Sequence, residues 1–99
     1  MGISKFIILA ELPVKPEYLE DVKALSMATL IPTLQEPGCE SFYQTVKSDD
    51  PNTLVFFEVF SSKDAAELHL EAEYTKAFFA GIQGKLSSKP VSSILQQLL

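Results

Sequence analysis

The segment 53–60 (TLVFFEVF) most constrains the fold of this 99-residue chain. Its β-branched and aromatic residues are typical of a strand, and both of its faces are apolar except at Glu58. Because side chains alternate between the two faces of a sheet, this strand needs an apolar cover on each side. Helices of the same chain can supply one cover, and a second copy of the sheet is the simplest source of the other. We therefore expect a homodimer.

Three further segments are predicted to be strands. Residues 3–12 and 39–48 are rich in β-branched and aromatic types, and residues 91–98 follow Pro90. The polar cluster at 49–52 (DDPN) is typical of a turn. Two strands joined by so short a turn should form an antiparallel hairpin.

Two helical regions are expected between the strands. The first begins at Pro16, and Pro32 should kink or break it because proline lacks the N–H that a helix interior uses. The second begins at Ser61, which with Asp64 suits an N-cap, and it ends at Gly84. Helical spacing places two sets of residues on its inward faces: Ala65, Leu68, His69 and Ala72, then Tyr74, Ala77, Phe78, Gly81 and Ile82.

The order strand, helix, strand, strand, helix, strand predicts the α+β class. Two split strand–helix–strand units fit a ferredoxin-like sandwich, with one four-stranded antiparallel sheet and helices on one face. A chain of 99 residues forms one domain, so we expect residues 1–99 to be a single unit.

Composition excludes several classes of partner. The net charge is −5, and the eight basic residues are all lysine. Nucleic acids and anionic membrane surfaces are bound by dense basic patches, so neither is an expected partner. Cys39 is the sole cysteine, and the sequence shows neither a signal peptide nor an apolar run of membrane-spanning length. We expect a cytoplasmic protein.

The chemistry available to the chain is limited. Its four glycines are scattered and form no phosphate loop, and one histidine cannot build a histidine-based zinc cluster. No flavin, nicotinamide or haem signature appears. We expect neither a metal nor a bound cofactor, and any reaction would use few polar groups.

Two residues are candidate catalytic groups. His69 titrates near neutral pH and shares the inward helical face, so it is either a proton carrier facing a pocket or a core histidine bonded to the backbone. Glu58 interrupts an apolar strand, so it is either a pocket acid or base with a raised pKa or a structural acceptor. Residues that could line an aromatic pocket, or pack in an ordinary core, are Tyr43, Phe57, Phe60, Tyr74 and Phe78.

Several short motifs follow one another in a fixed order. They are Glu36-Pro37-Gly38-Cys39, Phe42-Tyr43, Phe57-Glu58-Val59-Phe60, Ala65-Ala66 with His69, and Tyr74 with Phe78-Phe79. In this order and spacing they resemble the antibiotic biosynthesis monooxygenase family over about residues 3–95. The chain departs from the family pattern at Phe60, where many members have tryptophan, and its first strand lacks an asparagine found in several oxygenases. Both departures argue against the haem-degrading branch.

The resemblance implies a dimeric α+β barrel, in which two ferredoxin-like sheets pack face to face and each protomer has its own pocket. It implies a small, often aromatic or quinol-like substrate. Some members oxygenate such molecules with O₂ and without metal or flavin, because the deprotonated substrate itself reduces O₂. In that chemistry His69 matches the family's proton-transfer histidine and Glu58 its strand acid.

Three functions are compatible with these observations. The first is a cofactor-independent monooxygenase of a phenolic or quinol-type molecule. The second is an isomerase of a small carbonyl compound, with or without a phosphate group, since fold does not fix the reaction. The third is a dimer that binds a small molecule without turnover. An open cavity beside His69 would favour the first two over the third.

Overall fold

Four strands form one antiparallel sheet in the computed structural model, which describes residues 5–98. They are β1 (Phe6–Pro13), β2 (Cys39–Lys47), β3 (Asp50–Phe60) and β4 (Val91–Leu95), in the spatial order β2-β3-β1-β4. The apolar strand β3 is central and pairs with both β1 and β2. This order, with all neighbours antiparallel, is the ferredoxin-like topology that the sequence predicts.

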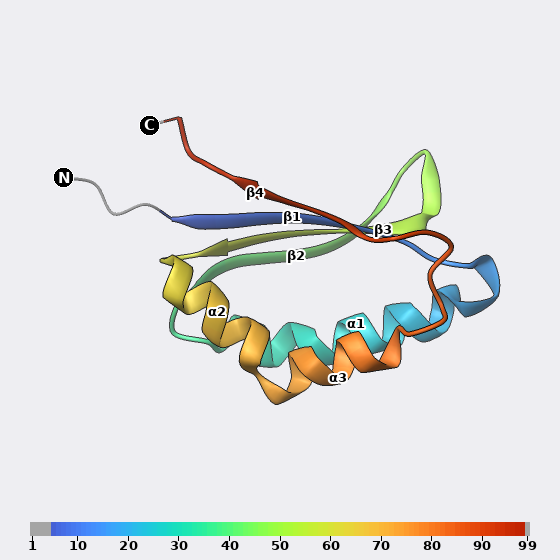
Figure 1. Ribbon diagram of the computed structural model, residues 1–99, viewed down its shortest axis with the longest axis horizontal. Helices are drawn as coiled ribbons and strands as arrows, with labels where there is room; N and C mark the ends of the chain where they lie inside the picture. Colours follow the sequence, from blue (N-terminus) through green and yellow to red (C-terminus); the bar gives the residue numbers. More distant parts are fainter. Residues whose placement is uncertain (1–4, 99) are drawn as a thin grey trace.

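The helices all lie on one face of this sheet (Figure 1). A short 3₁₀ turn, η1 (Pro16–Tyr18), leads into α1 (Leu19–Leu34), while α2 (Lys63–Glu71) and α3 (Glu73–Gly81) connect β3 to β4. Figure 1 shows no helix over the opposite face, which is therefore uncovered within the described part of the chain. No helix within the described residues is long and apolar enough to cross a membrane.

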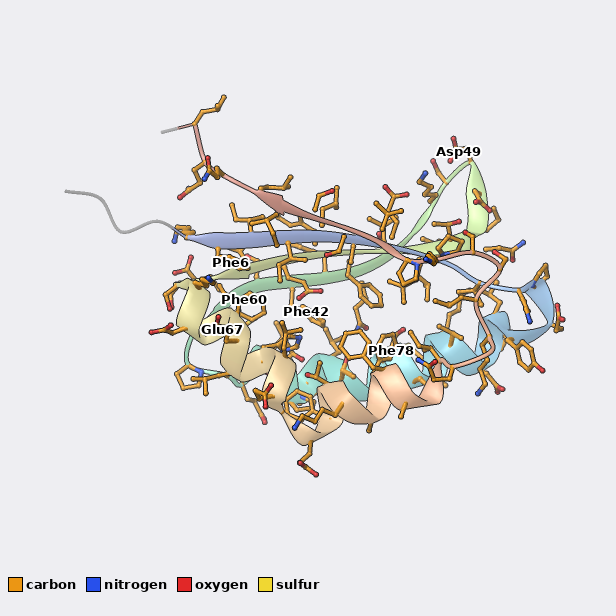
Figure 2. All side chains as sticks on the ribbon, in the orientation of Figure 1. Phe6, Phe42, Asp49, Phe60, Glu67 and Phe78 are labelled. Atoms are coloured by element: carbon orange, nitrogen blue, oxygen red, sulfur yellow. The ribbon has the colours of Figure 1, made fainter. Side chains whose placement is uncertain are left out.

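The core fills the space between the sheet and the helices. Near the β1–α1 connection, Val14 and Val22 are almost fully buried and pack with Leu54 and Ile82. A second cluster around Phe60 joins the other end of the sheet to α2. Figure 2 shows the aromatic rings of Phe42, Phe60 and Phe78 in the layer between the sheet and the helices. Between the two clusters the layer is hollow, and this hollow is the candidate site.

The structure corrects three local expectations about the helices. Helix α1 continues through Pro32 to Leu34, because the proline stands in the last turn and the following N–H of Gln35 reaches the Ile31 carbonyl at 3.1 Å. The N-cap of α2 is Ser62 and not Ser61: the Ser62 hydroxyl accepts a hydrogen bond from the Ala65 N–H at 3.1 Å.

The third correction concerns the inward faces: Leu68 is 74% exposed and Ala77 on α3 is exposed too, although the periodicity placed both of them inward. The buried residues of α2 are Ala66 and His69, which shows that the helix is rotated away from the predicted face.

Two strand boundaries also differ from the prediction. The hairpin turn is shorter than expected because β3 begins at Asp50, and β4 ends at Leu95, before the predicted end at residue 98. Residues 3 and 4 of the first predicted strand lie outside the described residues.

Candidate active site

A cavity of about 370 Å³ lies between the sheet and helices α2 and α3. Its volume is in the range of small-molecule sites. Apolar side chains form most of its wall, among them Ile8, Phe42, Phe56, Phe78, Ile82 and Ile94. The polar residues in the wall are Thr29, Glu58, His69, Thr75 and Ser92. A ligand here would be surrounded by hydrocarbon, with a few polar groups to orient it.

His69 is held at one side of this cavity by helix α2. The residue is 5% exposed, and its ring packs beside those of Phe60 and Phe42, at centroid distances of 5.1 and 5.8 Å. The residue stands in the last turn of α2, where the helix dipole favours a positive charge.

Glu36 orients the imidazole of His69. The Nδ1 atom of His69 lies 2.9 Å from the Glu36 Oε2 atom. A carboxylate only accepts hydrogen bonds, so this contact assigns the hydrogen to Nδ1 and leaves Nε2 as the basic nitrogen. Nε2 lies 3.8 Å from the Glu58 Oε1 atom, too far for a hydrogen bond. The lone pair of Nε2 is therefore available to a ligand.

The connection between α1 and β2 supplies Glu36, and two contacts fix it there. The hydroxyl of Tyr74 donates a second hydrogen bond to Glu36 Oε2. Gly38 packs so closely on α2 that a Cβ atom built there would collide with the Cβ of Ala65. Glycine is thus required for the close approach that brings Glu36 to His69.

Tyr74 acts here as a hydrogen-bond donor. Burial, the hydrogen bond to Glu36 and the negative charge of Glu36 raise the pKa of Tyr74 to about 12. The phenol therefore keeps its proton at neutral pH, and with it the contact that positions Glu36.

Glu58 is the second ionisable group in the cavity wall. In the sheet register it pairs with Ile8 of β1 and Phe42 of β2, so its carboxyl group is flanked by hydrocarbon. Burial and, to a lesser extent, the charge of Glu36 raise the pKa of Glu58 to about 7. Near neutral pH this carboxyl group can therefore either donate or accept a proton.

The predicted aromatic pocket residues separate into two groups. Phe78 lines the cavity, Phe60 packs against the His69 ring, and Tyr74 contacts Glu36. Tyr43 and Phe57 pair across β2 and β3 on the opposite face of the sheet, outside the cavity.

Strand alternation explains this separation, since Glu58 and its immediate neighbour Phe57 cannot face the same side. Phe56 on the same strand and Phe42 across from Glu58 share its face, and both line the cavity. The two-residue period of a strand, applied from Glu58, would have identified Phe56 as a cavity residue from the sequence. The sequence did not single out Glu36 as a site residue. Its position immediately before a Pro-Gly turn is the only local feature that could have indicated a role in the site.

The described residues hold no cluster of three or more histidine, cysteine or acidic side chains that could bind a metal ion. The ionisable groups in the cavity wall are one imidazole, that of His69, and one carboxyl group, that of Glu58.

The profile of the family "Antibiotic biosynthesis monooxygenase" matches residues 5–81. The chain belongs to this family. A protein of Mycobacterium tuberculosis named "Putative monooxygenase Rv0793" is 30% identical over 89 residues, which cover 90% of this chain and 86% of that protein. Its solved structure superposes with a TM-score of 0.91 at 25% identity and covers 96% of both chains.

Two other comparisons extend the family assignment. An uncharacterised Synechocystis protein, sll1783, is 31% identical over 72 residues, which cover 73% of this chain but 49% of that protein. The chain thus spans about half the length of this relative. A solved structure from Nitrosomonas europaea has a TM-score of 0.92 over 99% of this chain and 94% of its own. At 18% identity, this last likeness shows the fold alone.

The match to the antibiotic biosynthesis monooxygenase family confirms the family that the motifs indicated. The solved structure of the Mycobacterium tuberculosis relative confirms the ferredoxin-like fold. It supports a monooxygenase at the level of the family.

Proposed function

We propose that the protein is a cofactor-independent monooxygenase of a small phenolic or quinol-type molecule. The observation that carries the proposal is the position of His69 in the wall of a mostly apolar cavity, with Nδ1 bound to Glu36 and Nε2 without a hydrogen bond. Removing the phenolic proton in such a cavity gives an electron-rich phenolate, and few polar groups are present to stabilise it in place of water.

The reaction begins with transfer of the phenolic proton to Nε2 of His69. The phenolate then gives one electron to O₂, and the resulting superoxide and phenoxyl radicals combine to form a C–O bond at an unsubstituted ring carbon. The peroxide takes a proton from the imidazolium or from Glu58, whose pKa of about 7 suits that exchange.

The reaction ends when the hydrogen on the same ring carbon leaves as a proton and the O–O bond breaks. The hydroxide that leaves is protonated to water. In total, a phenol and O₂ give a quinone and water, with no external reductant.

Oxygen uptake by the purified protein tests this proposal, with a panel of hydroquinones and naphthols and no added cofactor. A general base typically contributes a factor of about 10²–10⁴ to the rate, so His69→Ala should lower O₂ uptake by roughly a hundredfold or more. Leu68→Ala is the matched control, because this exposed neighbour on α2 lies outside the cavity wall.

Equal O₂ uptake by the wild-type protein and His69→Ala would refute the role of His69. Turnover of a carbonyl substrate without O₂ uptake would identify the isomerase alternative. Retention of a ligand without any turnover would identify a binding protein.

The same proposal includes a homodimer. The sheet face without helices (Figure 1) carries Leu9, Phe57 and Val59, which alternate with the cavity-facing residues of their strands and are half-buried. An identical face on a second copy would match this apolar surface, as expected for a symmetric contact.

A further inference from the structure

The cavity is open to solvent along one side. The residues of its wall that are exposed are Leu70, Phe79, Pro90, Val91, Ser92 and Ile94. They belong to the end of α2, to α3, and to β4 with the residue before it. Every wall residue supplied by α1, β1, β2 or β3 is buried or half-buried. The opening therefore lies between the two short helices and β4.

Strand β4 forms one side of this opening because it is an edge strand of the sheet. It pairs with β1, and all its residues except the half-buried Leu95 are exposed. Ile94 stands opposite Ile8, which also lines the cavity, so the Ile94 side chain faces the helices. Ser92 faces the same way, two residues earlier on the strand. The opening is thus separate from the helix-free face that the proposed dimer would cover.

The rim of the opening is apolar. Its large side chains are those of Leu70, Phe79, Val91 and Ile94. No lysine within the described residues lines the cavity, and the carboxyl group of Glu58 belongs to the buried part of the wall. An anion that entered here would lose its water at a rim without a permanent positive charge. Burying a charge without a partner is costly.

We propose that this opening is the ligand entrance and that its apolar rim selects uncharged ligands over anions. The inference takes from the proposed function only that this cavity is the ligand site. A phenol then enters with its proton and gives it up to His69 inside the cavity. A carbonyl compound with a phosphate group would be rejected at the rim.

An uncharged dye, 1-naphthylamine, tests where the entrance lies. An apolar cavity of about 150 Å³ holds one benzene ring, and this cavity of about 370 Å³ has room for the two fused rings of the dye. In a fluorescence titration at neutral pH, Ser92→Trp should weaken binding of the dye by roughly tenfold or more, because the indole overfills the opening. Ser93→Trp is the matched control: this neighbouring serine is equally exposed, but its side chain faces the other side of the sheet, and binding should not change.

A second dye tests the selection by charge. The compound 5-aminonaphthalene-1-sulfonate has the same rings and amine with one added negative charge. The wild-type protein should bind it at least about a hundredfold more weakly than 1-naphthylamine, since the charge loses its water on entry. Phe79→Lys places a cation at the rim and should reduce this ratio of the two dissociation constants by roughly 2–5-fold, the usual effect of one exposed ion pair. Leu68→Lys adds the same charge at an exposed position outside the wall and should leave the ratio unchanged.

Four results would overturn the inference: equal binding of the two dyes by the wild-type protein, unchanged binding in Ser92→Trp, equal effects of the two lysine variants on the ratio, or no binding of the neutral dye. The proposed function fails differently, through absent O₂ uptake or unchanged uptake in His69→Ala. Neither dye titration depends on turnover, so selection of the neutral dye without any O₂ uptake would leave this inference standing while the monooxygenase reaction falls.

Discussion

The substitution Glu58→Gln should make the protein more stable at alkaline pH while changing its stability little at acidic pH. Glutamine preserves the shape of the side chain and cannot ionise. Burial raises the pKa of Glu58 from its ordinary value of 4.5 to about 7 in the folded chain. Between these two pH values the unfolded chain releases the proton and the folded chain keeps it.

This difference fixes the sign and the size of the effect. As pH rises from 4.5 to about 7, the unfolded state gains stability relative to the folded state, so the wild-type protein loses stability, and the loss is complete above pH 7. At about 1.4 kcal/mol for each pH unit, the total is about 3 kcal/mol. Glu58→Gln removes this loss, so its free energy of unfolding should exceed that of the wild-type protein by up to about 3 kcal/mol at pH 8.

Urea denaturation between pH 4.5 and 8.5, at one protein concentration, measures the difference between variant and wild type. Subtraction cancels the titration of all shared groups. Glu67→Gln is the control, since Glu67 is exposed on α2, away from the cavity (Figure 2). Its difference curve should be flat. A flat or falling curve for Glu58→Gln would show that the site does not raise the pKa of this carboxyl group.

Three further substitutions test the supporting structure. Gly38→Ala should destabilise the fold by about 1–3 kcal/mol in urea denaturation, because its Cβ would collide with Ala65; unchanged stability would show that α2 can move away. Ser62→Ala should cost about 1 kcal/mol through loss of the α2 N-cap, measured in the same way, whereas Ser61→Ala should cost less. Phe57→Asp should convert the proposed dimer to a monomer in analytical ultracentrifugation, and an unchanged mass would exclude this sheet face as the interface.

Periodicity alone predicted the architecture well. The alternating apolar strands and the helical regions between them are local patterns, and they define the same order of elements in the structure. Errors occurred where local signals compete. Pro32 was expected to kink or break α1, yet the helix continues to Leu34 and the N–H of Gln35 still bonds to the Ile31 carbonyl at 3.1 Å. Proline at this position removes one N–H donor, and the helix needs only two more residues to end.

The candidate site was only partly visible in the sequence. His69 and Glu58 stand out because a polar residue in an apolar pattern has to be explained, and both line the cavity. Glu36 lies 33 positions from His69 along the chain, and its 2.9 Å contact exists because the Pro-Gly turn packs against α2.

The sequence by itself determined the class of fold, the family and the two ionisable residues that interrupt apolar segments, because these follow from residue type and spacing along one chain. Only the tertiary structure decided which nitrogen of His69 is free of hydrogen bonds and which aromatic rings enclose the cavity. Each of these depends on the packing of segments distant in sequence. For the rings on the strands, a one-residue change in strand phase would move them to the other face of the sheet.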